Sequence, residues 1–290
     1  MVNGVVNPYL DVPADMIRLR ILNGDGKYAF NYQVKDAQGN VVPLVLIATD
    51  AGYTTETFTL DNIVMGTGER TEWLLDMRGL EGDTLYIWNM SEELEDGIIG
   101  KDGLNNVSAP NTALLQLRVG PAQTTSPIIS FPFTLLPSEQ PDTAGVLHVT
   151  KVFRKDVFTV DGVTKQYFNI DSVLMDMMVV NDTVMLDSSE IWTIDNQTDV
   201  AHPFHIHDIH FWVTEIIDSS GNVVDPATRP DIFGGPLDNV LVMPYEKLSW
   251  IGTFEDYGTQ VAPDSTYMYH CHILPHEDKG MMHQFVVWNG

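Results

Sequence analysis

The sequence is poor in cysteine and in basic residues. Its 290 residues include one cysteine, Cys271, and 15 lysines and arginines against 40 aspartates and glutamates, a formal net charge of −25. A single cysteine excludes an intrachain disulfide, so cysteine pairing says nothing about the compartment. The shortage of positive charge argues against a nucleic-acid partner, because phosphate binding needs a basic face. An acidic surface favours cationic substrates or solubility at high salt, and plain solubility charge explains it equally well.

Long hydrophobic runs and helical periodicity are also missing. No apolar run approaches the roughly 20 residues of a membrane span, and we find no signal peptide. No 12-residue window of the first half has a convincing helical period. What is present instead is a series of short segments with strand-like composition, separated by turns rich in glycine and aspartate. Strands are predicted at residues 16–23, 30–34, 41–48, 72–76, 84–88, 113–119, 157–160, 167–170, 190–195, 211–217, 248–254 and 267–272.

Two series of strands lie on either side of a segment poor in charge and rich in proline, serine and threonine. This composition predicts an all-β chain of two β-sandwich domains, residues 1–122 and 146–290, joined by a linker at residues 123–145. A weak internal repeat supports one fold used twice. RLRILNG at residues 18–24 resembles EIWTIDNQ at 190–197, and MGTGERTEWLL at 65–75 resembles MPYEKLSWIG at 243–252.

The cysteine lies in the segment YHCHILPHEDKGMM, residues 269–282. Histidines flank Cys271 on both sides, His276 follows five positions later, and Met281 follows ten positions later. One thiolate, imidazoles and a thioether form the ligand set of a trigonal copper site with a weak axial methionine. Structural zinc is the poorer alternative, because it usually takes several cysteines or an ordered set of cysteines and histidines.

Strand geometry divides these ligands between two sites. If the strand reaches residue 272, Cys271 points to one face while His270 and His272 point to the other. A second cluster, AHPFHIHDIHFW at residues 201–212, places His205 and His207 on one face by the same rule. We expect Pro203 to interrupt the hydrogen-bonded ladder and so to let His202 face a different centre.

Together these two motifs resemble the C-terminal copper domain of the multicopper oxidases, the family of laccases, bilirubin oxidase and bacterial cuprous oxidases. The HCHILPHED segment is most similar to bacterial laccases of the spore-coat type and to their copper-efflux relatives, and RLRILNG with TDAGY at residues 49–53 resembles the middle domain of a three-domain oxidase. The resemblance implies two cupredoxin-like Greek-key domains, the first without metal ligands, and a secreted, periplasmic or spore-coat location. It also implies type 1 copper ligands His202, Cys271, His276 and Met281, a type 2 ligand His205, and type 3 ligands His207, His270 and His272.

Half of the family's trinuclear ligands are absent from this sequence. A trinuclear cluster takes eight histidines, four of them from an N-terminal domain with two His-x-His pairs. Outside the two motifs the chain has only His148 and His283, which we predict to be solvated or hydrogen-bonded, as we do for His210. The start of the chain suggests a fragment, so we expect a missing N-terminal domain or a second copy to complete the cluster.

The resemblance predicts an oxidase that takes single electrons from phenolic or metal-ion substrates at the type 1 copper and reduces O2 to water. Glu277 is a candidate proton donor, because reduction of O2 consumes four protons; the alternative is a surface acid. Two other functions stay open: a type 1 copper module for electron transfer or copper binding, and a scaffold that serves structure or assembly. Four methionines, Met175, Met177, Met178 and Met185, are predicted to pack in the core instead of binding cuprous ion.

Overall fold

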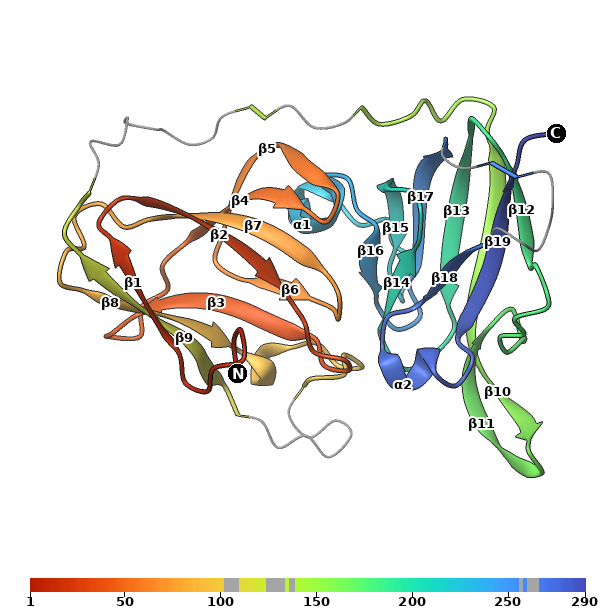
Figure 1. Cartoon of the computed structure of the whole chain (residues 1–290), viewed down its shortest axis with the longest axis horizontal. Coiled ribbons are helices and arrows are strands. Elements are labelled where there is room, and N and C mark those ends of the chain that lie inside the picture. The colour runs from red at the N-terminus through yellow and green to blue at the C-terminus, as the bar shows by residue number, and fades with distance from the viewer. Residues whose placement is uncertain (102–109, 124–133, 136–138, 256–257, 260–265) are drawn as a thin grey trace.

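The computed structural model describes residues 1–101, 110–123, 134–135, 139–255, 258–259 and 266–290. The chain forms two β-sandwiches side by side, the first built from β1–β9 and the second from β10–β19 (Figure 1). This arrangement of two β-sandwiches confirms the predicted all-β fold class. The predicted linker at residues 123–145 falls largely on residues outside the described part of the chain, so the domain bounds stay a prediction.

The first sandwich consists of two sheets, ordered β1-β9-β8-β3-β6 and β2-β7-β4-β5. The alternation of buried and more exposed side chains along the strands explains how the two sheets pack. In β7 and β8, every second side chain is buried between the sheets while its neighbours are partly or fully exposed. The strands are β1 (Tyr9–Pro13), β2 (Met16–Leu22), β3 (Phe30–Asp36), β4 (Leu44–Thr49), β5 (Gly52–Leu60), β6 (Ile63–Met65), β7 (Arg70–Asp76), β8 (Thr84–Asn89) and β9 (Thr112–Gly120), with a 3-10 turn η1 (Ser91–Glu93).

The second sandwich also has two sheets, ordered β11-β10-β13-β17-β15 and β12-β19-β18-β14-β16. The elements are β10 (Leu147–Val160), β11 (Val163–Ile170), β12 (Asp182–Met185), β13 (Ser188–Asn196), β14 (His202–Ile206), β15 (Phe211–Ile217), η3 (Pro226–Thr228), α1 (Pro230–Phe233), β16 (Asn239–Val242), β17 (Lys247–Phe254), β18 (Tyr267–Cys271), α2 (Leu274–Glu277) and β19 (Met282–Trp288). None of the helices in the described residues is long and apolar enough to span a membrane.

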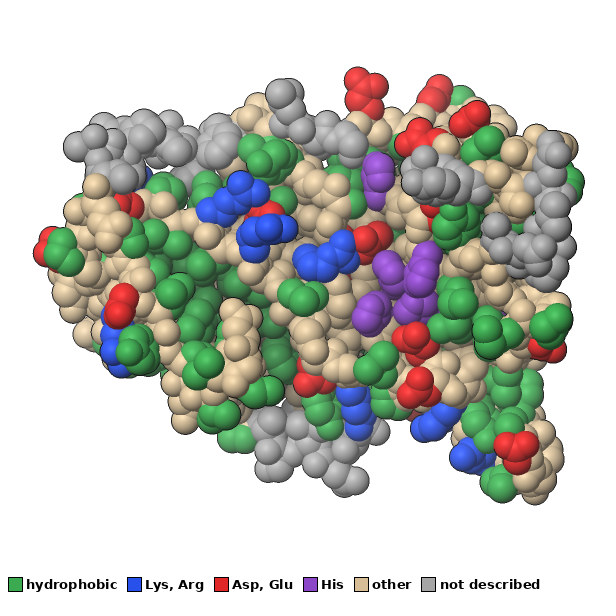
Figure 2. All heavy atoms as spheres, in the orientation of Figure 1, with side chains coloured by type: hydrophobic (Ala, Val, Ile, Leu, Met, Phe, Trp, Pro, Cys, Tyr) green, Lys and Arg blue, Asp and Glu red, His purple; other side chains and the backbone are tan. Residues whose placement is uncertain are grey.

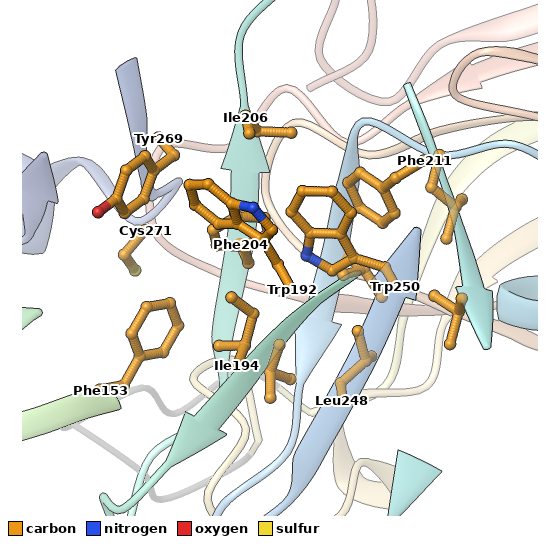
Figure 3. Packing of buried hydrophobic residues seen from close by; sticks show 14 of the residues in the cluster. Phe153, Trp192, Ile194, Phe204, Ile206, Phe211, Leu248, Trp250, Tyr269 and Cys271 are labelled. Carbon is orange, nitrogen blue, oxygen red and sulfur yellow. The ribbon is translucent and has the colours of Figure 1, made fainter. Parts of the chain in front are cut away.

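Aromatic side chains fill the second core. Trp192 and Trp250 stack with ring centroids 5.4 Å apart, and Tyr269 meets Trp192 edge to face at 5.2 Å. Phe204 and Phe153 extend this core toward the thiol of Cys271, which lies at its margin (Figure 3). Burial of such large apolar side chains stabilises the sandwich and leaves the region around the sulfur dry.

Strand register brings the two histidine motifs together. β14 pairs antiparallel with β18, and the register opposes Phe204 to Cys271 and His205 to His270. Directly opposed residues share a face, so the thiol lies on the core face and the two imidazoles lie on the other.

The expectation that Pro203 interrupts the ladder was wrong. β14 is continuous through Pro203, which pairs with Leu241 of β16. His202 faces the core because it lies three positions before His205, an odd spacing that places the two imidazoles on opposite faces of one strand.

The two sandwiches contact each other through defined hydrogen bonds. Arg70 at the start of β7 forms an ion pair with Asp238, which precedes β16, at 2.6 Å. The backbone N–H of Leu274 in α2 donates to the carbonyl of Gly26, and the hydroxyl of Thr49 donates to the carbonyl of Pro236. The first sandwich therefore contacts the second at residues 236–238, which precede β16, and at α2, which follows β18.

Candidate metal centre

Three ligand candidates converge on the core face of β14 and β18. The sulfur of Cys271 lies 3.5 Å from Nδ1 of His202 and 3.6 Å from Nδ1 of His276. Cys271 and His202 are completely buried, as is Met281. The backbone of Met281 donates to the carbonyl of His276 and accepts from the N–H of Cys271. We call His202, Cys271, His276 and Met281 the cysteine site.

Burial sets the charge of these groups. Burial lowers the pKa of His202 well below its ordinary value, with smaller contributions from His276 and Lys155. It lowers the pKa of His276 to about 4, helped by nearby lysines. Burial also raises the pKa of the Cys271 thiol. Both imidazoles are therefore neutral near pH 7, which is the form that binds a metal.

A hydroxyl fixes the orientation of one imidazole. Oγ1 of Thr198 lies 2.9 Å from Nε2 of His202, and the same hydroxyl lies 2.9 Å from the side-chain oxygen of Asn196. When the hydroxyl donates to an oxygen, it can only accept from the imidazole. His202 then carries its proton on Nε2 and keeps the Nδ1 lone pair directed at the sulfur. Thr198 could not be predicted from the sequence, because an isolated threonine has no recognisable pattern.

A second group lies on the opposite face of the same strands. Donor atoms of His205, His207 and His270 lie within 4.8 Å of one another, and Nε2 of His207 is 3.3 Å from Nε2 of His270. The ring of His272 is 5.5 Å from the rings of His205 and His270, but His272 is outside the group of three. We call the four residues the histidine site. Histidine side chains gather on the surface here, beside basic and acidic side chains (Figure 2).

The histidine site is more accessible than the cysteine site. His207 is exposed, His205 and His272 are partly exposed, and His270 is buried. Burial lowers the pKa of His270 to about 3, and burial and the neighbouring imidazoles lower the pKa of His207 and of His272. Nδ1 of His272 is buried without a hydrogen-bond partner among the described residues. The lowered pKa values favour the neutral, metal-binding form of His207, His270 and His272.

Glu277 lies between the two sites. Its carboxylate oxygen Oε2 is 3.3 Å from Nδ1 of His270, and its side chain is 23% exposed. Burial and the adjacent Asp278 raise the pKa of this carboxyl. It is therefore not a freely solvated surface acid, and its partner is one of the predicted trinuclear ligands.

The remaining histidines do not join either site. His148 and His210 are exposed, and Nδ1 of His283 lies 2.9 Å from the hydroxyl of Tyr269. These positions confirm the predicted solvated or hydrogen-bonded roles.

The predicted core packing of the four methionines was wrong for three of them. Met177, Met178 and Met185 are 73%, 79% and 50% exposed. The segment that carries Met177 and Met178 lies on the surface because its backbone carbonyls bond to the Gln284 side chain, and this leaves the methionine side chains outside the core.

The donor sets fit copper in two different ways. A single buried thiol with two neutral imidazoles and an adjacent thioether is a soft, mixed set that suits a type 1 copper ion, whereas a set of imidazoles suits a harder divalent copper. A β-sandwich that carries these two donor sets on opposite faces is suited to bind copper.

Comparison with known proteins gives the family. Residues 149–290 match the profile of the multicopper oxidases. The multicopper oxidase mco of Staphylococcus haemolyticus is 28% identical over 293 residues, which cover 100% of this chain and 52% of that protein. A laccase of Haloferax volcanii is 28% identical over 299 residues, which cover 100% of this chain and 47% of that protein. The structure of the laccase-like multicopper oxidase CueO from Ochrobactrum sp. is 26% identical, covers 98% of this chain and 58% of its own, and superposes with a TM-score of 0.74.

Residues 149–290 belong to the multicopper oxidase family, and the whole chain is similar to multicopper oxidases and laccases. It spans about half the length of the curated relatives that it matches. Copper is therefore the cofactor of the family to which these two sites belong.

Proposed function

We propose that this chain forms the type 1 copper site and half of the trinuclear ligand set of a laccase-like multicopper oxidase. Such an enzyme oxidises phenolic or metal-ion substrates one electron at a time and reduces O2 to water, with four electrons and four protons consumed for each O2. The observation that carries the proposal is the pairing of β14 with β18, which opposes Phe204 to Cys271 and His205 to His270. A thiol and an imidazole pair then occupy opposite faces of the same two strands.

The residues of the cysteine site would hold one copper ion. His202, Cys271 and His276 would be the strong ligands and Met281 the weak axial ligand. Copper supplies reversible one-electron chemistry when it is bound there. The protein keeps water away from this site, because Cys271 and His202 are completely buried and the ring of Phe168 packs at 4.4 Å from that of His276.

The residues of the histidine site would hold their share of the oxygen-reducing copper ions. Cys271 is bonded directly to His270 and His272 in the chain, so only a few covalent bonds separate the two sites. Glu277 would deliver protons to this face, which its distance of 3.3 Å from Nδ1 of His270 supports. Four imidazoles are half of what a trinuclear cluster needs, so the other ligands would come from a further domain or from a second copy of the chain.

Copper loading tests the proposal. The purified chain should bind one tightly held copper at the cysteine site and turn blue on oxidation. Cys271→Ser should abolish the colour, because the thiolate is the donor on which the colour depends, while His210→Ala, which changes an exposed histidine outside both sites, should leave it unchanged. A blue Cys271→Ser protein would overturn the assignment.

Oxygen uptake separates the oxidase from the alternative, a type 1 copper module without oxidase activity of its own. Three coppers cannot be held by four histidines, so the isolated monomer supplied with copper and a phenolic reductant should not reduce O2 to water. Sustained uptake that disappears in His205→Ala would show that copies of this chain complete the cluster by themselves.

A further inference from the structure

One segment of the metal-free first sandwich contacts the histidine site directly. The hydroxyl of Thr67 donates to the carbonyl oxygen of His272 at 2.6 Å, and the side-chain amide of Asn239 donates to the carbonyl oxygen of Thr67 at 2.8 Å. Gly68 lies against the ring of His272: a Cβ at this position would be 2.6 Å from Nε2. Residues 66–70 therefore form part of the wall behind the imidazoles.

Arg70, the last residue of this segment, forms a bidentate ion pair with Asp238. Its two terminal nitrogens donate to the two carboxylate oxygens of Asp238, each at 2.6 Å. The same guanidinium donates to the carbonyl of Asp50 at 3.0 Å and lies 3.2 Å from its carboxylate. Bidentate pairs of this kind fix geometry as well as charge.

Asp238 in turn contacts a predicted copper ligand. Nδ1 of His205 lies 2.7 Å from the backbone carbonyl of Asp238 and 3.6 Å from its carboxylate Oδ1. Both of these partners are acceptors, so the proton of a neutral His205 belongs on Nδ1. The Nε2 lone pair is then available to bind a metal. A ligand imidazole whose second nitrogen donates to a carbonyl or carboxylate is held in one tautomer and one orientation.

We propose that Arg70 is a positioning residue for His205, acting through Asp238. Residues 1–122 contain no histidine or cysteine, yet Arg70 in this part of the chain holds the acceptor that fixes the tautomer and the ring orientation of an imidazole in the other sandwich. This inference rests on the proposed function only for what His205 binds; the arrangement of the imidazole itself is independent of it.

Nitrogen-15 NMR of the imidazoles tests the positioning without any metal. In the metal-free protein His205, assigned with the His205→Gln variant, should show a single Nδ1–H tautomer. Arg70→Gln should convert His205 to a mixture of tautomers. Arg70→Lys keeps the charge but loses the two-nitrogen hydrogen bond to Asp238, and it should give an intermediate spectrum. The lysine variant also provides the test if Arg70→Gln does not fold. The matched control is Arg78→Gln, because Arg78 also pairs through two nitrogens with an aspartate, Asp76, but on the surface. An unchanged His205 signal in folded Arg70→Gln or Arg70→Lys would overturn the proposal.

Copper titration gives a second readout that separates the two proposals. With the cysteine site already filled, Cu²⁺ should bind the histidine site of Arg70→Gln about 10- to 100-fold more weakly than that of the wild-type chain. The blue band of the cysteine site should not change in either protein. If the wild-type histidine site takes up no copper, the assignment of His205 as a ligand fails, while the NMR result still decides the role of Arg70.

Discussion

Oγ1 of Thr198 lies 2.9 Å from Nε2 of His202, and both side chains are buried. This hydrogen bond directs Nδ1 of His202 at Cys271. Thr198→Val keeps the shape of the side chain and removes the acceptor, which leaves a buried N–H unpaired at a cost of about 1–3 kcal/mol. We expect weaker copper binding and an altered reduction potential. Thr198→Ser retains the hydroxyl and should restore both, as measured by copper titration and spectroelectrochemistry. Equal values in the valine and serine variants would contradict this role.

Met281→Leu tests the weak axial ligand. Met281 is completely buried beside Cys271, and leucine replaces it with little change in volume. The variant should stay blue, because the thiolate is retained. Its reduction potential should rise, because an axial thioether donates weakly to the oxidised metal. A potential that is unchanged or lower in a redox titration would exclude Met281 as a ligand.

Glu277→Gln tests proton delivery in the assembled enzyme. The carboxyl lies 3.3 Å from Nδ1 of His270, and a positioned general acid contributes about 10²- to 10⁴-fold to a rate. Reduction of O2 should slow by a factor in this range while the blue band is retained. The neighbouring Asp278→Asn, at an exposed position, should turn over at the wild-type rate. Equal rates in the two variants would return Glu277 to the role of a surface acid.

Gly68→Ala tests the contact between the two sandwiches. Gly68 has a φ of +81°, where alanine is strained by about 1–2 kcal/mol, and its Cβ would overlap the ring of His272. Gly79→Ala is a matched control, because Gly79 also has a φ of +81° but no atom within 4 Å of its Cβ. In urea titrations Gly68→Ala should lose more stability than Gly79→Ala, and only Gly68→Ala should shift the NMR signals of His272. Equal losses without that shift would exclude a tight contact.

The buried carboxyl of Glu246 should make the free energy of unfolding depend on pH. It is 5% exposed, and burial raises its pKa from 4.5 to about 7. Between these values the folded protein holds a proton that the unfolded chain has lost, so the free energy of unfolding falls as the pH rises through this window.

The size of this fall is on the order of 3 kcal/mol, and it should be missing from Glu246→Gln. The variant should therefore be more stable than the wild type at pH 8 and similar to it at pH 4. Glu81→Gln changes the net charge equally at an exposed position and controls for the acidic surface. Parallel stability curves for Glu246→Gln and the wild type would exclude this role.

The sequence was sufficient to find the two groups of donor residues that the structure brings together, because the spacing of these residues along the chain is local. Alternation along a strand was enough to predict that Cys271 and His270 lie on opposite faces. The same rule would have placed His202 and His205 on opposite faces without any role for Pro203. The residues that orient the ligands could not be found in this way. Arg70 and Asp238 are 168 positions apart, and their pairing depends on how the two sandwiches pack.

Strands were predicted where alternation or β-branched residues were dense, and missed elsewhere. β5, which includes the polar stretch of residues 53–57, has few apolar positions, and the predictions omitted it together with β6, β12, β16 and β19. The methionines near residue 177 were placed in the core because their neighbours are β-branched, but the Gln284 side chain holds that backbone as a surface loop. Hydrogen bonds between distant segments leave no periodic pattern in a sequence.

The position of Cys271 between two histidines on β18 limits how this stretch of the gene can change. Deleting or inserting one residue before Tyr269 would slip the strand against β14 and rotate each side chain that follows to the opposite face. The thiol would then point to the surface and the imidazoles into the aromatic core, and both sites would be lost in one event. Point substitutions can alter the two sites separately, whereas a one-residue change of length in β18 would remove them together.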